Sequence, residues 1–578
     1  MNQKTGKARK TQRRELAKYR QAIPLLGEAP VEFESASPAG VNRSSALLAV
    51  IAVLVFLAIV RLRIADVPLE RDEGEYAYAG QLILEGIPPF ELVYNMKLPG
   101  IYYAFSVILT IFGQTSWGIH VGLLCVNAAT VLILFFLARR LLHDSMAAAV
   151  AASAFGVLTL DRWILGVFAH ATHFVVLAAI AGLLVLLHGL EKNKKLHYVV
   201  AGVLLGTSVL MKQNGIFFLA LGIGIALWNG ARRAGALRSG MFHAVLLVAG
   251  SAIPFVLLLT VFLAQGVFDK FWFWTIQYGT QYISETPVSL AWTLFGSTLA
   301  DVTQADRAIW ILAAVGIAAR WAVRWAVETR VLLMGLLAAS LMAICPGLYF
   351  RQHYFILLLP VVGLFVGVAA LSLARLVGYY ASSRVARLVS VSVFVASVGI
   401  YTYNEWRYLF SMPTNELSRT RYGTNPFVEA PEIARYIQAR TAANDRIAVL
   451  GSEPEIYFYA NRKSSTGYIY TYPLTEQQKY SARMQDEMID EISSHHPKYL
   501  VFVRVVASWL PRSSNERILQ WSDRYIKKCY DLVGIADIQR PEPTRFAWDA
   551  EAVGYQPRST ETVYTFRSTG DAACVAAP

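Results

Sequence analysis

Apolar stretches alternate with short polar connections from residue 45 to residue 404. A helix needs about 20 predominantly apolar residues to cross the hydrocarbon core of a membrane. The pattern therefore predicts a polytopic α-helical membrane protein with about eleven transmembrane helices. The predicted spans are residues 45–64, 117–138, 145–160, 167–189, 198–211, 215–229, 241–264, 308–326, 331–346, 354–373 and 388–404.

Basic residues gather between alternate pairs of these stretches. They are Arg139 and Arg140; Lys192, Lys194 and Lys195; Arg232, Arg233 and Arg238; Arg320, Arg324 and Arg330; and Arg375, Arg384 and Arg387. The preceding segment, residues 1–44, is also basic. Lysine and arginine accumulate in cytoplasmic loops, so we predict that the tail and all five clusters are cytoplasmic.

This orientation decides how Gly100–Phe112 is interpreted. The segment is apolar but too short to span, and a crossing here would move Arg139 and Arg140 outside. We therefore predict a re-entrant or interfacial helix, within a long outer loop at residues 65–116. Residues 265–307 form the second predicted outer loop.

The pattern changes after residue 404. Helices are predicted at residues 429–440 and 476–493, and short apolar strands at 446–450 and 499–503. This alternation indicates a small C-terminal α/β extracytoplasmic domain at residues 405–578. A disulfide between Cys529 and Cys574 is compatible with that compartment, although their spacing alone does not predict it.

Composition agrees with a membrane protein. The chain is 55% hydrophobic and only 16% charged, with a mean hydropathy of +0.41 and a net charge of +13. Charged residues make up about 25% of a typical soluble protein. Because the basic tail precedes a span, its expected partner is the lipid surface and not nucleic acid.

Three carboxylates stand close together in the first outer loop, at Asp72, Glu73 and Glu75. Asp72 and Glu75 have the spacing of a capping box for a helix running to Leu84. Close carboxylates at a membrane surface are equally suited to act as a general base or to hold a cation. The residues alone leave both interpretations open.

Three cations are predicted on the same side. Lys97 precedes the short apolar helix, Lys212 interrupts two short spans, and Arg351 lies between two spans. Lys97 and Arg351 are either interfacial anchors or phosphate ligands. Lys212 is a functional candidate because ionisable groups are costly at such positions.

The arrangement of these motifs resembles the polyprenyl-phosphate-sugar glycosyltransferases of the C-type fold. These include the dolichyl-phosphate-mannose protein mannosyltransferases and the lipid A aminoarabinose transferases. The matching residues are Asp72-Glu73, Lys97-Leu98-Pro99-Gly100-Ile101-Tyr102-Tyr103, and Arg351-Gln352-His353-Tyr354 before a span containing Pro360. The resemblance covers about residues 45–404.

The resemblance implies a transferase that moves a sugar from a polyprenyl phosphate to a glycan, lipid or protein acceptor outside the cytoplasm. Asp72 would orient or deprotonate the acceptor hydroxyl, with Glu73 as a second catalytic candidate, while Lys97 and Arg351 would bind the phosphate leaving group. Tyr354 would support the phosphate. Tyr102, Lys212 and His353 are further candidates for substrate binding. Asp161 is the nearest candidate for the second acid that many members carry.

Two further questions are open: whether two histidines bind a metal, and whether the chain is a transporter instead of a transferase. His170 and His173, three apart, are either a metal pair or core histidines, and we expect no metal or other cofactor. A transporter or flippase would also place charges in broken helices. No inverted repeat is evident and the charges gather at one face, which favours the transferase. The expected location is the inner (plasma) membrane, with the N-terminus cytoplasmic.

Overall fold

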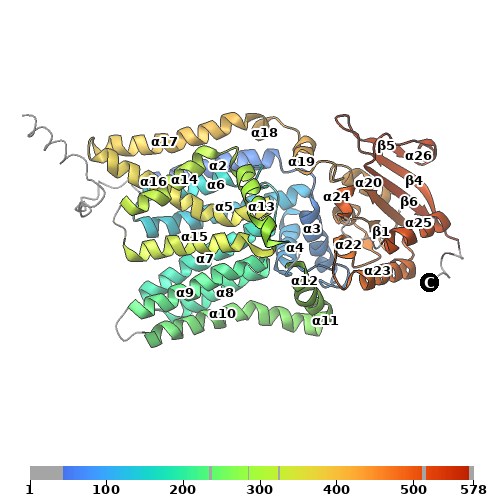
Figure 1. The fold of residues 1–578 in the computed structure, drawn as a ribbon, viewed down its shortest axis with the longest axis horizontal. Helices are drawn as coiled ribbons and strands as arrows, with labels where there is room; N and C mark the ends of the chain where they lie inside the picture. Colours follow the sequence, from blue (N-terminus) through green and yellow to red (C-terminus); the bar gives the residue numbers. More distant parts are fainter. Residues whose placement is uncertain are drawn as a thin grey trace, which may run out of the picture.

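A helical bundle carries a mixed-sheet domain at one end in the computed structural model of the chain (Figure 1). The structure describes residues 43–232, 237–283, 286–322, 326–510, 516–571 and 574. Most of the basic tail, together with Arg233 and Arg324 of the basic clusters, lies outside the described residues.

Eight helices among the described residues are long and apolar enough to cross a membrane, and they account for eight of the eleven predicted spans. They are α2 (Arg43–Arg63), α5 (Ser116–Leu142), α7 (Ala171–Lys192), α9 (Ile216–Arg232) with the turn η1 (Gln213–Gly215), α10 (Leu237–Ala264), α15 (Val327–Ile344), α16 (Leu359–Gly378) with η4 (Gln352–Leu358), and α17 (Ser383–Asn404).

The other three predicted spans are helices that are not full spans on their own. They are α6 (Ser145–Leu158), α8 (Lys195–Met211) and α14 (Arg307–Ala322). The last forms a pair with α13 (Val288–Thr303), bent by 114°, which would make a ninth span if counted as one. The bundle is confirmed, whereas the count of eleven stays a prediction.

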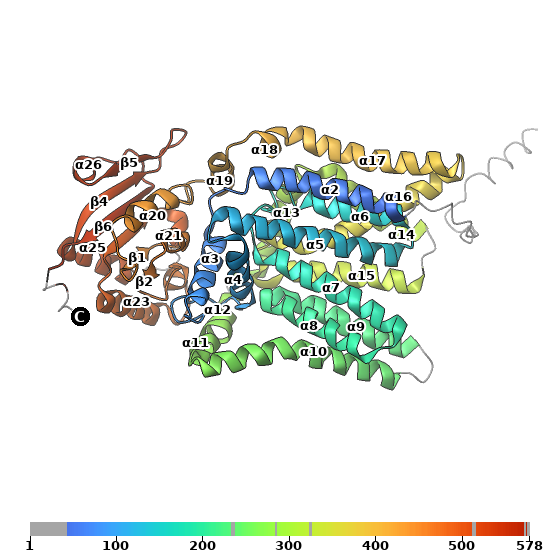
Figure 2. The same ribbon diagram turned by 180° about the vertical axis from the view of Figure 1, so that it is seen from behind.

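Both predicted outer loops contain helices. The first holds α3 (Arg71–Leu84) and α4 (Gly100–Phe112), the short apolar helix. The second is largely helical, with α11 (Phe268–Trp272), the π-helical η2 (Phe273–Tyr278) and α12 (Gly279–Ile283) before α13. In both views α3 and α4 lie between the bundle and the sheet domain (Figures 1 and 2).

The chain after Asn404 builds one six-stranded sheet in the order β2-β1-β3-β6-β4-β5. β1 (Arg446–Leu450) pairs in parallel with β2 (Lys463–Ser464) and β3 (Tyr499–Arg504), and the remaining pairings are antiparallel. The other strands are β4 (Tyr530–Asp537), β5 (Arg545–Trp548) and β6 (Thr562–Ser568). The strands expected at 446–450 and 499–503 are therefore present.

The remaining helices lead from the bundle to the sheet, connect its strands or cover it, and the first of them contacts α2 and α17. They are α18 (Trp406–Phe410), α19 (Thr414–Tyr422), α20 (Ala430–Gln438), α21 (Glu455–Ala460), α22 (Tyr472–Thr475), α23 (Ser481–His495), α24 (Val506–Trp509), α25 (Arg517–Cys529) and α26 (Ala550–Gly554). The helix predicted from residue 476 begins five residues later, at Ser481, because the short helix α22 and a polar turn precede it.

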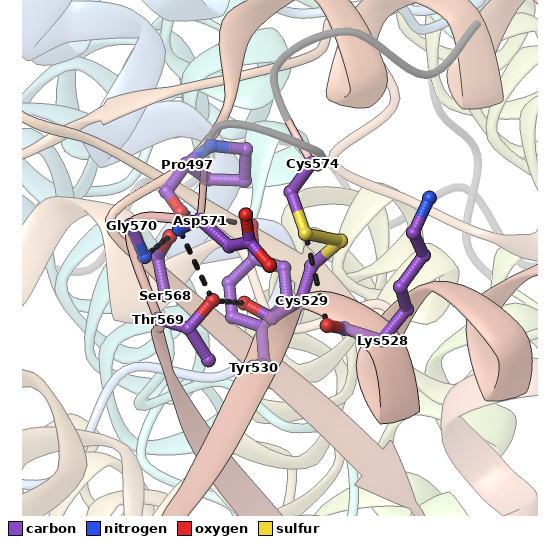
Figure 3. Close-up of a disulfide and its surroundings, with 9 residues drawn as sticks. All are labelled: Pro497, Lys528, Cys529, Tyr530, Ser568, Thr569, Gly570, Asp571 and Cys574. Carbon is purple, nitrogen blue, oxygen red and sulfur yellow. Dashed lines mark hydrogen bonds between the residues drawn. A yellow bond between two sulfur atoms is a disulfide. The ribbon is translucent and has the colours of Figure 1, made fainter.

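A disulfide closes the end of the sheet domain. Cys529 at the end of α25 is bonded to Cys574 beyond β6, with their Cα atoms 5.7 Å apart (Figure 3). The pair that the sequence left open is therefore formed, and it ties the last described residue to the sheet.

Candidate active site at the start of helix α3

The N-terminus of α3 is capped by Glu70 and Glu73, not by Asp72 and Glu75. The Glu70 side chain accepts a hydrogen bond from the Glu73 backbone at 3.0 Å, and the Glu73 carboxylate accepts one from the Glu70 backbone at 3.1 Å. The predicted capping box is therefore wrong by two residues. Asp72 is free of the structural role that competed with its chemical one.

Glu73 is a buried structural residue. Its carboxylate lies 3.0 Å from His120 Nε2 and accepts a hydrogen bond from the Ala169 backbone. The residue is fully buried. It thus joins α3 to α5 and to the turn before α7, and the structure does not place it with Asp72 at the candidate site.

Asp72 and Glu75 share a face of α3 because they are three residues apart. Lys97 Nζ lies between them, 2.7 Å from Asp72 Oδ1 and 2.6 Å from Glu75 Oε2. The Asp72 and Lys97 side chains are about one-fifth exposed, whereas Glu75 is fully buried. The lysine predicted as a phosphate ligand is thus already paired with two carboxylates.

Tyr102 stands behind this ion pair. Its side chain is fully buried, and its hydroxyl donates a hydrogen bond to Glu75. Glu75 also accepts one from Asn95 Nδ2 at 3.0 Å. Tyr102, predicted to bind substrate, therefore supports the carboxylate that holds Lys97.

Close backbone contact brings Lys97 toward Lys212. A Cβ on Gly100, at the start of α4, would lie 2.5 Å from the Leu210 carbonyl oxygen, so only glycine fits against the end of α8. The Gln213 side chain also donates to the Met96 carbonyl at 2.8 Å. These contacts hold the segment before α4 against the turn that carries Lys212.

Lys212 reaches the residues after Arg351. Its Nζ lies 3.5 Å from His353 Nε2 and 4.2 Å from the centroid of the Tyr354 ring. No carboxylate of the described residues forms an ion pair with Lys212. Burial lowers the pKa of Lys212 to about 7; Asp72 opposes that shift, and the charges of Lys97 and Arg351 add to it.

The turn before η4 has unusual backbone geometry. Leu348 and Phe350 adopt positive φ angles of 55° and 45°, which are rare for residues with a side chain. Arg351, His353 and Tyr354 follow this turn, and the Arg351 guanidinium lies 5.4 Å from the ring centroid of Tyr349. Such strain is often retained at functional sites.

His170 completes a group that we call the Asp72 cluster: Asp72, Lys97, His170, Lys212 and His353. His170 Nδ1 lies 3.8 Å from Asp72 Oδ2, and its ring stacks on His353 with centroids 4.2 Å apart. His173, by contrast, points to Asn127 Oδ1 at 3.0 Å. His170 and His173 therefore face different partners and do not form the metal pair considered from their spacing.

The electrostatic state of Asp72 is set by competing effects. Burial disfavours its ionised form, but the charge of Lys97, with His170 and His353, holds the pKa of Asp72 well below its usual range. Burial likewise disfavours charge on Lys97, yet Asp72 and Glu75 hold its pKa well above the ordinary value. At neutral pH the two form an ionised pair.

Asp72, His170 and His353 can each offer one metal-ligand atom, and these atoms lie within 4.8 Å of one another. The two imidazoles, however, are nearly parallel, with 14° between their planes. An imidazole binds a metal through a nitrogen lone pair in the ring plane. Two stacked rings cannot both point at one ion, so the arrangement does not fit a metal without turning a ring. The absence of a cofactor stays a prediction.

Asp161 lies outside the Asp72 cluster. It is buried in the turn between α6 and α7, accepts a hydrogen bond from the Trp163 backbone, and has Glu405, Arg421 and the buried Asp306 as ionisable neighbours. Burial is the main cause that raises the pKa of Asp161 to about 7. Within the described ranges its hydrogen bonds do not reach α3. The position of Asp161 therefore does not support its assignment as the second acid that many family members carry.

The fold has solved counterparts. ArnT from Cupriavidus metallidurans bound to undecaprenyl phosphate is 15% identical, with 93% of this chain and 100% of that chain aligned at a TM-score of 0.57. The apo state of the same protein is also 15% identical. The alignment covers 92% of this chain and 100% of that chain, at a TM-score of 0.56. The chain is thus a polytopic membrane protein with the C-type glycosyltransferase fold.

A family model adds a sequence-level match. Residues 97–259 match the dolichyl-phosphate-mannose-protein mannosyltransferase family. This segment begins at Lys97 and includes Lys212. No curated protein matches the chain. The resemblance indicated by the motifs is confirmed by this family match and by the fold.

Proposed function

We propose that the chain is a membrane glycosyltransferase that moves a hexosyl or pentosyl group from a polyprenyl phosphate to an acceptor outside the cytoplasm. The observation that carries the proposal is the meeting of Asp72, Lys97 and Lys212 at one place, with Arg351 close by. These are a carboxylate for the acceptor and cations for a phosphate leaving group. The family match and the fold favour this activity over a transporter or flippase.

Lys212 is the cation best prepared for the donor phosphate. Lys97 is neutralised by Asp72 and Glu75, whereas Lys212 has an imidazole and an aromatic ring around its amine. A partly buried amine without a carboxylate partner gains most from an incoming anion. Arg351 adds a planar group that can bind two phosphate oxygens.

Donor binding would also change Asp72. The negative charge of a phosphate near Lys97 offsets part of the effect of Lys97 on Asp72. The pKa of Asp72 therefore rises toward its ordinary value. A carboxylate with a higher pKa is a better proton acceptor. The base would thereby become effective when the donor is in place.

The transfer step follows from these positions. The acceptor oxygen forms a bond to the anomeric carbon and gives its proton to Asp72. The bond between that carbon and the phosphate oxygen breaks, and its electron pair leaves with the polyprenyl phosphate. Lys212, Lys97 and Arg351 stabilise the charge of this leaving group.

Two observations support an orientation with the sheet domain outside. Disulfides persist in oxidising compartments, and the domain contains the Cys529–Cys574 bond. The start of α5 touches that domain through Ser116 and Tyr459, whose hydroxyls are 2.9 Å apart, so basic Arg139 and Arg140 lie at the far end of the same helix. Because basic residues favour the cytoplasmic side, this arrangement supports a sheet domain on the opposite side of the membrane.

The test uses purified protein and a panel of labelled polyprenyl-phosphate hexoses and pentoses. We expect release of polyprenyl phosphate from at least one donor. Replacing Lys212 or Arg351 with Ala should each weaken donor binding by about 1.5–3 kcal/mol, the range for charged hydrogen bonds. Unchanged affinity in both variants would remove them from the site, and movement of intact donor across vesicles without bond cleavage would favour the flippase.

A further inference from the structure

The sheet domain is packed directly against the first turns of α3. A Cβ on Gly74 would lie 2.6 Å from the Glu455 backbone nitrogen, so α3 and α21 touch through their backbones. Arg71 forms an ion pair with Glu453 at 3.0 Å and lies over the ring of Tyr472. These contacts fix the domain beside the helix that carries Asp72.

One segment of the domain reaches the site itself. The Gly467 carbonyl accepts a hydrogen bond from the Tyr94 backbone at 2.8 Å, which holds residues 465–472 beside the segment leading to Lys97. The buried Tyr470 then donates its hydroxyl to Asp72 Oδ1 at 3.1 Å. Lys97 Nζ also lies 5.3 Å from the centroid of the Tyr470 ring.

Asp72 Oδ1 therefore has two donors, Lys97 from the membrane module and Tyr470 from the sheet domain. Oδ2 is turned toward His170, 3.8 Å away. If a donor phosphate draws Lys97 away from Asp72, the hydrogen bond from the Tyr470 hydroxyl still holds the Asp72 carboxylate in this orientation. The other titratable groups that interact electrostatically with Asp72 are two carboxylates, two histidines, one lysine and four tyrosines: Glu70, Glu75, His170, His353, Lys212, Tyr76, Tyr354, Tyr422 and Tyr472.

We propose that Tyr470 is a positioning residue for transfer, through which the C-terminal domain completes the active site of the membrane module. The proposal rests on the proposed function for its catalytic consequence, because Asp72 is the group that Tyr470 positions. It also makes a claim about Asp72 alone: its carboxylate is held and kept ionised partly by a side chain from a different domain.

Tyr470→Phe removes only the hydroxyl and keeps the buried ring. Tyr468→Phe is the matched control, because Tyr468 is buried in the same segment and its hydroxyl donates to another carboxylate, Glu487, at 2.8 Å. Both variants lose one hydroxyl–carboxylate hydrogen bond. Only the first loses it at Asp72.

The activity measurement is transfer by the full chain in lipid nanodiscs, with the polyprenyl-phosphate sugar turned over by the unmodified protein. For Tyr470→Phe we expect kcat to fall about 10-fold, KM for the donor to change less than about 3-fold, and the acidic limb of the pH profile to move upward by about 0.5–1 pH unit. Tyr468→Phe should match the unmodified protein in all three.

A second measurement does not require activity. Carbodiimides modify protonated carboxyl groups. The extent of reaction at pH 5–6, assigned to Asp72 itself and not to Glu70, Glu73 or Glu75 by fragment-ion mass spectrometry, therefore reports the protonated fraction of Asp72. Tyr470→Phe should raise that modification about 3–10-fold, the change that corresponds to the same 0.5–1 pH unit, with no rise in Tyr468→Phe.

The two measurements separate the possible failures. Equal modification of Asp72 in both variants would overturn the role of Tyr470, whether or not any donor is consumed. Increased modification in Tyr470→Phe alone supports the role of Tyr470 even if the donor panel fails, and that failure would count against the proposed function only. Equal kcat and pH profiles in both variants, with an active unmodified protein, would also overturn the role of Tyr470.

Discussion

Lys212 is a partly buried amine in a polar turn, with its pKa lowered to about 7 mainly by loss of solvation. At pH 8 it is mostly neutral, and at pH 6 mostly protonated. A bound phosphate favours the protonated form at both pH values. The residue thus links donor affinity to proton uptake.

We expect polyprenyl phosphate binding at pH 8 to take up close to one proton at Lys212 and much less at pH 6. Calorimetry in buffers of different ionisation enthalpy measures this number. Lys212→Arg is the control, because arginine stays charged and should bind without that uptake. Equal uptake by the unmodified protein and by Lys212→Arg would contradict the assignment.

Asp161 carries a different pH dependence, in stability. Its folded pKa of about 7 is above the ordinary value of 3.8, so folding favours the protonated form. The stability that this proton contributes is complete below about pH 3.8 and is lost as the pH rises to about 7. Asp161→Asn should therefore raise the thermal midpoint more at pH 8 than at pH 5.

The same variant tests the catalytic alternative. Because Asp161 lies apart from the Asp72 cluster, transfer by Asp161→Asn should stay within a few-fold of the unmodified protein. A loss of transfer as large as that of Asp72→Asn would restore Asp161 as a second catalytic acid.

Single residues show where sequence reasoning succeeds and where it fails. The motifs singled out Asp72, Lys97 and Arg351 because each belongs to a short pattern. The structure pairs Asp72 with Lys97, whereas the roles of all three in transfer stay predictions. The cap was misplaced because Asp is a stronger N-cap residue than Glu, yet Glu70 occupies that position. Tyr470 was missed because its bond to Asp72 joins residues 398 apart, and no local periodicity records such a contact.

At the scale of elements, α3 is the piece that joins the two domains. It is packed on α4 through Ser106 near Gly80, and on α21 at Gly74. A helix held on two sides has little freedom to shift, which keeps Asp72 and Glu75 on one face toward Lys97. The long apolar helices were predictable from hydropathy, whereas α6, α8 and α14 are too short for hydropathy to define their number of crossings.

Gly74→Val should separate α3 from α21. The added side chain meets the Glu455 backbone, which cannot move as a flexible side chain would, and overpacking of this kind costs about 1–3 kcal/mol. We expect a lower thermal midpoint and faster proteolysis between residues 411 and 429, which connect the two domains.

Gly399→Val, in the last third of α17, is the matched control for this prediction. A Cβ there meets nothing within 4 Å, so the substitution adds the same side chain without a clash. If both variants are equally stable and equally resistant to protease, the contact between α3 and α21 does not hold the domains together.

For the whole molecule, the proposed orientation predicts that the end of the bundle far from the sheet domain and the sheet domain itself face opposite sides of the membrane. Asn193, in the turn between α7 and α8, and Ser494, near the end of α23, are both exposed. Cysteines placed there, in a background without the exposed Cys125 and Cys345, should react from opposite sides of the membrane. Ser494→Cys should react in intact cells and Asn193→Cys only after permeabilisation. Reaction of both in intact cells would contradict the orientation.

The central claim is that Asp72 acts in sugar transfer, and Asp72→Asn in the full chain tests it most directly. The cap of α3 is formed by Glu70 and Glu73, so the helix should remain intact. Asn still accepts a hydrogen bond from Lys97 but cannot serve as a base. With the labelled polyprenyl-phosphate sugar that the unmodified protein consumes, we expect donor binding within about 3-fold and transfer reduced about 10²–10⁴-fold. Transfer at a near-normal rate by a folded Asp72→Asn protein would contradict the account.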